Sequence, residues 1–245
     1  MEILMDFEYL QRIEELLTTF RKTQMDSLAM GASAIADCLI SDGMIYAFGT
    51  GHSHMFALEI FYRAGGLANI NPILEEGLML HTGAVKSTFL ERVEGYAAEI
   101  LKRYPVKKGD IIFIASNSGR NAVSIEMAIE AKKQGLTVIA ITSIRHSSAV
   151  ASRHSSQKRL FELADIVIDN CGEEGDAAVD ITGVGKVCPT SSVIGITALH
   201  TMISEAIKIA VAKGKTPDIF ISANVDGASP NEGYINKYKS RVSSY

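Results

Sequence analysis

The chain has 245 residues, 47% of them hydrophobic, which is enough for one large core and predicts a single domain with an extension. Its 24 basic and 28 acidic residues give a net charge of −4 without a dense basic block, so no nucleic acid and no anionic membrane surface is expected as a partner. No apolar run reaches the roughly 18 residues that cross a bilayer, and the acidic N-terminus lacks the pattern of a signal peptide. We therefore expect a cytoplasmic protein with a small-molecule partner.

The first 39 residues carry apolar side chains, from Leu4 onward, at helical spacing and without an internal proline. This pattern predicts one long helix or two helices in series, which we assign to an N-terminal helical extension over residues 1–40. Its apolar surface favours packing on a second subunit, so we expect a homodimer or a homotetramer.

Beyond residue 40 the pattern changes to apolar runs of strand length, with amphipathic helical stretches between most of them. Strands that are apolar on both faces and alternate with helices predict a parallel sheet covered on both sides, and hence a three-layer α/β/α domain over residues 41–245. The expected strands are 44–49, 68–74, 110–116, 136–142 and 165–170, and the expected helices are 53–64, 86–103, 121–134 and 191–212. The polar link 143–164 is expected to be a loop that leads into a short helix, and the turn-rich tail from Thr216 is expected to pack on the edge of the domain.

The cysteines Cys38, Cys171 and Cys188 are odd in number and far apart. Neither a disulfide framework nor a zinc site built on cysteine is therefore indicated. We expect all three to be reduced, structural thiols.

A glycine turn leaves the first predicted strand and enters a helix, which is where backbone N–H groups and the helix dipole form an anion site. Its residues are Gly49, Thr50, Gly51, His52 and Ser53. A tight turn without a ligand explains the pattern equally well, and a dinucleotide site is weakened because His54 replaces the third glycine of that motif.

A second polar turn follows the third predicted strand and again opens a helix. Its residues are Ser116, Asn117, Ser118, Gly119 and Asn121. One helix cap would explain one of these residues but not several in succession. In a sheet of order 2-1-3-4-5 the two turns meet at the topological switch point, so together they predict a pocket for a phosphate group.

The motifs GTGHS and ASNSGRN, followed by LTVIAITS, resemble the sugar isomerase (SIS) domain over about residues 35–215. The resemblance implies a five-stranded parallel sheet of order 2-1-3-4-5. It also implies phosphosugar binding by Ser53, Ser116, Ser118 and Asn121, and by Ser192 at the start of the last helix. Phosphoheptose isomerases are similar, as is a group with a single SIS domain and a long N-terminal helix that shares stretches such as SRHSS, ADIVIDN, GDA and SANVDG.

Phosphoheptose isomerases carry a His and a Glu on the first helix, and a Gln and a His on the last. This chain has Glu59, Arg63, Ser192 and His200 at those positions, so three of the four residues that could hold zinc in that family are changed. We expect neither a metal nor a cofactor. The resemblance implies aldose–ketose isomerisation, for which Glu59 and His200 are the candidate base and acid; without it, His200 would be expected to be a core histidine.

Two alternatives remain open. The segment RVEGYA, with Glu94, resembles the part of N-acetylmuramic acid 6-phosphate etherases that holds a catalytic glutamate, although Glu94 on an amphipathic helix is more typical of a solvated surface. A sensor that binds a sugar phosphate without turnover is the second alternative.

The other histidines are weaker candidates. His52 is expected either to bind phosphate or to pack at the helix start, and His81 is a second-rank substrate contact. The histidines of the polar link, His146 and His154, lie beside Arg145 and Arg153. This link is expected to be either a lid over an anionic sugar or a solvated loop.

Overall fold

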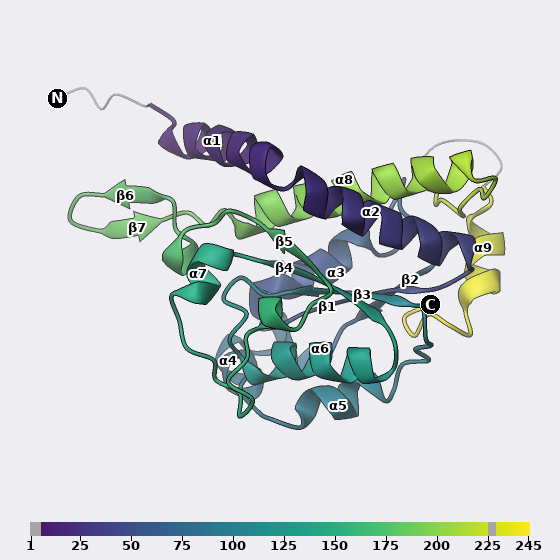
Figure 1. Cartoon of the computed structure of the whole chain (residues 1–245), viewed down its shortest axis with the longest axis horizontal. Coiled ribbons are helices and arrows are strands. Elements are labelled where there is room, and N and C mark those ends of the chain that lie inside the picture. The colour runs from purple at the N-terminus through teal and green to yellow at the C-terminus, as the bar shows by residue number, and fades with distance from the viewer. Residues whose placement is uncertain (1–5, 225–228) are drawn as a thin grey trace.

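The computed structural model describes residues 6–224 and 229–245 (Figure 1). Leu4, which belongs to the expected first helix, lies outside the described residues. So do positions 225–228 of the expected tail, which include part of the SANVDG stretch.

A parallel sheet of five strands forms the centre of the molecule, in the order β2-β1-β3-β4-β5, which confirms the predicted topology. The strands are β1 (Ile45–Gly49), β2 (Ile70–Ile73), β3 (Ile111–Ala115), β4 (Thr137–Thr142) and β5 (Ile166–Asp169). Every residue of β1, β2 and β3 is buried, as expected for a sheet that helices cover on both faces.

Alternate strand residues contribute to two separate cores, one on each face of the sheet. Ile45 and Ala47 of β1 pack with α2 (Met25–Ile40), α3 (His54–Ile60) and α8 (Ser191–Ala212). On the other face, Tyr46 and Phe48 pack with α5 (Tyr96–Leu101) and α6 (Ala122–Lys133). The three predicted layers are therefore present (Figure 1).

Two helices in series form the N-terminal region, α1 (Glu8–Thr23) and α2, and they are separated by Gln24. The side chain of Gln24 is buried, and its Oε1 accepts a hydrogen bond of 3.0 Å from the N–H of Asp169 at the end of β5. The second helix lies within the core cluster of the sheet, so that part of the predicted extension packs on the domain itself. The predicted domain boundary at residue 40 stays a prediction.

The single helix expected over residues 86–103 is wrong, because a turn divides it into α4 (Ala84–Leu90) and α5. Gly95 has a φ of 85°, a backbone conformation that disfavours other residues. Its N–H lies 2.6 and 2.8 Å from the two carboxylate oxygens of Glu126 on α6. A contact with a distant element therefore fixes the break.

The polar link was expected to be a loop that leads into a short helix. It contains the short helix α7 (Ile144–Ser148) directly after β4, and the loop that follows ends in a 3-10 turn over Leu160–Glu162. Two further elements were not expected from the sequence. A small antiparallel hairpin of β6 (Val179–Ile181) and β7 (Gly185–Val187) projects beside α1, and α9 (Asn231–Tyr238) follows near the C-terminus (Figure 1).

Helix α8 is long and apolar enough to cross a membrane by length and composition. In this fold one side of the helix, which includes Leu199 and Met202, packs in the core with α2, α3 and the sheet, and this accounts for the apolar residues on that side.

The three cysteines are free, but the prediction that all of them are structural is wrong for Cys188, which is exposed. Burial raises the pKa of the Cys38 thiol to about 12, which keeps it protonated and unreactive at neutral pH.

The packing of α8 leads to a stability prediction. A Cβ at Gly195 would overlap the ring of Phe56 on α3 and lie 3.2 Å from Ile141 of β4. Such overpacking costs about 1–3 kcal/mol, and the higher helix propensity of Ala returns about 1 kcal/mol of it. We therefore expect Gly195→Ala to lower the free energy of unfolding by up to about 2 kcal/mol, measured by chemical denaturation.

Gly31→Ala on α2 is the matched control. There the added Cβ meets the sulfur and Cγ of Met202, whose unbranched side chain can adjust more easily than an aromatic ring. We expect this variant to be as stable as the parent or more stable. Equal losses in both variants would show that ring contact does not decide the effect.

Candidate ligand site at the ends of β1 and β3

The turns after β1 and β3 start side by side, because Gly49 and Ala115 are partners in the register of these neighbouring parallel strands. The first turn leads into α3 on one face of the sheet, and the second leads into α6 on the other face. The two turns therefore flank the topological switch point, where ligands bind in sheets of this type.

The first turn is closed by glycine. A side chain at Gly49 would overlap the backbone of Ser53, whereas Gly51 has a φ of 56° and nothing within 4 Å of its missing Cβ. The hydroxyl of Thr50 is already used, because it donates a hydrogen bond of 2.7 Å to Glu91. Thr50 can therefore contact a ligand through its backbone but not through its hydroxyl.

The second turn is held by its own polar groups. The hydroxyl of Ser116 is buried and accepts the N–H of Gly119 at 3.2 Å. Gly119 has a φ of 57°, and a Cβ there would lie 3.0 Å from Ser147 Oγ and 3.2 Å from Leu160 Cβ. Both the backbone conformation and the close packing therefore require glycine at this position.

Several polar groups of the two turns are available to a ligand. Within the described residues, the hydroxyls of Ser53 and Ser118 have no hydrogen-bond partner, whereas Asn117 Oδ1 accepts a bond of 2.8 Å from Asn170. The Nδ2 of Asn117 and the Nε of Arg120 are buried in this part of the structure without a partner. Buried donors of this kind are rare in proteins and normally find an acceptor.

Asn121 does not cap α6 with its side chain, although it occupies the N-cap position. Its Oδ1 instead accepts a hydrogen bond of 3.0 Å from Arg153. Burial, followed by the charges of Arg120 and Arg92, lowers the pKa of the Arg153 guanidinium. The positive charges of Arg120 and Arg92 thus act on Arg153 beside the second turn, and the carboxylate of Glu91 acts in the opposite direction.

The polar link crosses the second turn through backbone contacts. The N–H of Arg153 donates to the carbonyl of Arg120 at 2.8 Å, and that of Leu160 donates to the carbonyl of Gly119 at 2.9 Å. Arg153 was expected to lie in a lid over an anionic sugar or in a solvated loop, and its contact with Asn121 was not predicted. In the same link, Nδ1 of His146 accepts the N–H of Gly175 at 3.3 Å.

Glu59 and His200 are brought together from α3 and α8, with 3.0 Å between Oε1 and Nε2. The side chain of His200 is 46% exposed, so the alternative of a core histidine is wrong. Arg63 Nη1 also lies 3.0 Å from the same carboxylate oxygen of Glu59. The guanidinium of Arg63 thus lies where a zinc ion bound to Glu59 would lie. A zinc ion therefore does not fit the set of Glu59, Arg63, Ser192 and His200.

The start of α8 is organised by Asp176, which is not one of the predicted site residues. Its Oδ1 accepts the N–H groups of Thr190 and Ser191 at 3.1 and 2.9 Å, and its Oδ2 accepts the hydroxyl of Ser191. Asp176 lies in the GDA stretch that this chain shares with the group of single SIS domains, and that stretch was the sequence signal for it. The neighbouring hydroxyl of Ser192 makes no hydrogen bond within the described residues.

Glu94 lies in the turn between α4 and α5, not on a helix as expected. Its two oxygens accept hydrogen bonds of 2.7 Å from the N–H and the hydroxyl of Ser155, and these bonds lower the pKa of Glu94. His52, which is part of the first turn, is exposed. His81 lies against His54 instead, with 6.0 Å between the ring centroids.

A doubly wound parallel sheet with two polar, glycine-containing turns at its switch point defines the class of α/β proteins that bind small anionic ligands there. Within that class the chain belongs to the SIS domain family, whose model matches residues 8–143. It is 42% identical to a UPF0309 protein of Geobacillus thermodenitrificans over 96% of this chain and 95% of the relative. It is 44% identical to a UPF0309 protein of Thermoanaerobacter pseudethanolicus over 96% of this chain and 98% of the relative.

Among solved structures, the chain is similar to a phosphoheptose isomerase from Neisseria gonorrhoeae. The TM-score is 0.53 at 16% identity, and the match covers 83% of this chain and 96% of that one. A phosphoheptose isomerase from Francisella tularensis gives a TM-score of 0.50 at 16% identity, with 85% of this chain and 100% of that one covered. At this identity the likeness shows a common fold.

Proposed function

We propose that this protein binds a phosphorylated sugar at the switch point of its sheet. The phosphate is held by backbone N–H groups of the two turns, by the hydroxyls of Ser53 and Ser118, and by the amide of Asn117. The observation that carries the proposal is this set of donors without partners, beside the positive charge of Arg153. Membership of the SIS domain family supports it.

The reaction that we propose is aldose–ketose isomerisation of the bound sugar phosphate. This reaction needs a base that moves a proton between C2 and C1 of the opened sugar, and an acid that moves a proton between the two oxygens. Glu59 is the proposed base and His200 is the proposed acid. Their contact of 3.0 Å on adjacent helices supports a joint role.

The etherase-like alternative depends on Glu94 as the catalytic glutamate. Both oxygens of Glu94 are already engaged by Ser155, whereas Glu59 and His200 face each other, and this favours isomerisation. A sensor without turnover would use the same phosphate site and is distinguished by experiment.

We also propose a cytoplasmic homodimer or homotetramer. The free thiols are consistent with a reducing compartment. Leu58 and Val193, which adjoin Glu59 and Ser192 in the sequence, have 45% and 39% of their surface exposed. A second copy of the chain would cover these apolar side chains beside the proposed site.

A thermal-shift screen of sugar phosphates tests the binding proposal. At a concentration of 100 times its Kd, a ligand stabilises the folded state by about 2.7 kcal/mol. For a chain of this length each kcal/mol raises Tm by about 2–4 °C. We expect a shift of this size with at least one sugar phosphate and little shift with the same sugar lacking phosphate. Equal shifts from both forms would contradict a site built around phosphate.

A further inference from the structure

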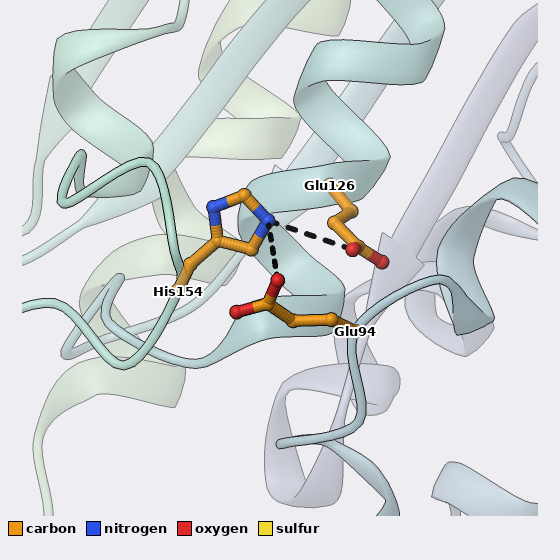
Figure 2. Close-up of side chains that lie close together, drawn as sticks. All are labelled: Glu94, Glu126 and His154. Atoms are coloured by element: carbon orange, nitrogen blue, oxygen red, sulfur yellow. Dashed lines mark ion pairs between the residues drawn. The ribbon is translucent and has the colours of Figure 1, made fainter.

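Three side chains outside the proposed sugar site converge from separate segments (Figure 2). Glu94 comes from the turn between α4 and α5, Glu126 from α6, and His154 from the polar link. One potential ligand atom of each lies within 4.8 Å of the others. His154 Nε2 is 3.5 Å from Glu126 Oε1 and 3.8 Å from Glu94 Oε2.

These two distances are too long for good hydrogen bonds, which measure about 2.7–3.2 Å between heavy atoms. They match two ligands of one metal ion. With metal–nitrogen and metal–oxygen bonds of about 2.0–2.2 Å and tetrahedral angles, neighbouring ligand atoms lie about 3.4 Å apart. The distances from His154 to the two carboxylates therefore suit a shared ion better than direct hydrogen bonds.

Each of the three groups is held in place by a partner behind it. Ser156 Oγ lies 2.7 Å from Nδ1 of His154 and can accept its proton, which leaves Nε2 free to bind a metal. The N–H of Gly95 holds both oxygens of Glu126, and Ser155 holds both oxygens of Glu94. Outer partners of this kind orient the ligands in protein metal sites.

The negative charges of Glu94 and Glu126 also favour a bound cation. Over the described residues no Lys or Arg lies within 4.0 Å of either Glu94 or Glu126, and His154 is the sole basic group near them. The His154 side chain is 9% exposed and that of Glu126 is 14% exposed, whereas Glu94 is 43% exposed. Two carboxylate oxygens thus lie within 4.8 Å of each other and of His154 Nε2 in a partly buried site, of which Glu94 is the most exposed member.

We propose that Glu94, Glu126 and His154 bind a divalent transition-metal ion of the zinc type, with water completing its coordination. One nitrogen and two oxygen donors suit such ions. The ion joins the α4–α5 turn, α6 and the polar link, and His154 directly follows Arg153, whose guanidinium reaches Asn121. The three residues of this site do not include Glu59 or His200, and a metal site was not expected from the sequence.

Calorimetric titration of chelator-treated protein with Zn²⁺ tests the proposal, and the visible absorption of bound Co²⁺ gives a second measure. We expect one ion per chain. Loss of an outer partner typically lowers metal affinity about 10–100-fold, so Ser156→Ala should do this, and His154→Ala should have at least as large an effect. The isosteric variant Glu126→Gln should also weaken binding.

His146→Ala is the matched control, because it removes another histidine of the same link and should leave affinity unchanged. Circular dichroism establishes whether each variant is folded. The rival arrangement has Nδ1 of His154 accept the N–H of Ser156, which lies 3.1 Å away, so that the Nε2 proton faces the carboxylates. Absence of binding by the parent, or binding that His154→Ala and Glu126→Gln leave unchanged, would overturn the proposal.

Discussion

Glu59→Gln is expected to slow proton exchange at C2 of a bound sugar phosphate by about 10²–10⁴-fold, which is the usual contribution of a positioned general base. Glutamine keeps the shape of the side chain but cannot accept the proton. The contact with His200, 3.0 Å in the parent, can persist as a hydrogen bond, so the fold should be little affected. Proton NMR in heavy water measures the exchange directly, with the sugar phosphate that gives the largest thermal shift as substrate.

Two further variants are needed to interpret this experiment. His200→Ala should also abolish exchange if the two residues act together. Glu205→Gln is the control, because this glutamate is on α8 and pairs with Lys208 at 2.7 Å, away from Glu59. Exchange that survives in Glu59→Gln and His200→Ala but is lost in Glu94→Gln, with metal content unchanged, would favour the etherase-like reaction. A ligand that binds the parent without any exchange would indicate a sensor.

The sheet could be predicted from the sequence because its strands are apolar on both faces, and that pattern needs no knowledge of the partners. The division of residues 86–103 into two helices could not be predicted from the sequence. It depends on the carboxylate of Glu126 holding the N–H of Gly95 across 31 positions of the chain. The hairpin of β6 and β7 was missed because its strands are short and largely exposed, so they show no buried periodicity.

The two turns of the site were also predictable, since glycine and hydroxyl residues directly follow apolar strands. The side chains that surround these turns could not be predicted. Thr50 is bound by Glu91 and Asn121 by Arg153, and both partners come from segments that reach the turns only in the folded chain. The exposure of His200 could not be predicted either, because the apolar sequence around it is typical of a core helix.

These differences divide the turn residues into two groups with different expected roles. Thr50, Ser116, Gly119 and Asn121 are engaged within the protein and shape the site. Ser53 and Ser118 have free hydroxyls among the described residues, and these are the groups that should contact phosphate. Substitutions in the two groups should therefore differ in whether they change stability, affinity or both.

Ser118→Ala is expected to lower the affinity for the bound sugar phosphate by about 1.5–3 kcal/mol, the range for a hydrogen bond to a charged group. This corresponds to a Kd about 10–150-fold higher. Because the Ser118 hydroxyl has no partner in the described protein, its loss should leave the free energy of unfolding unchanged. Calorimetric titration with the sugar phosphate, together with denaturation of the free protein, measures both quantities.

Ser116→Ala provides the contrast, because Ser116 Oγ accepts the N–H of Gly119 and its loss leaves that buried donor unsatisfied. This variant should lose about 1–3 kcal/mol of stability as well as affinity. Ser204→Ala on α8, whose hydroxyl bonds the carbonyl of Thr201 at 2.9 Å, should change affinity in neither direction. If Ser118→Ala binds the sugar phosphate as tightly as the parent does, the second turn is not the phosphate site. The donors without partners would then need another ligand.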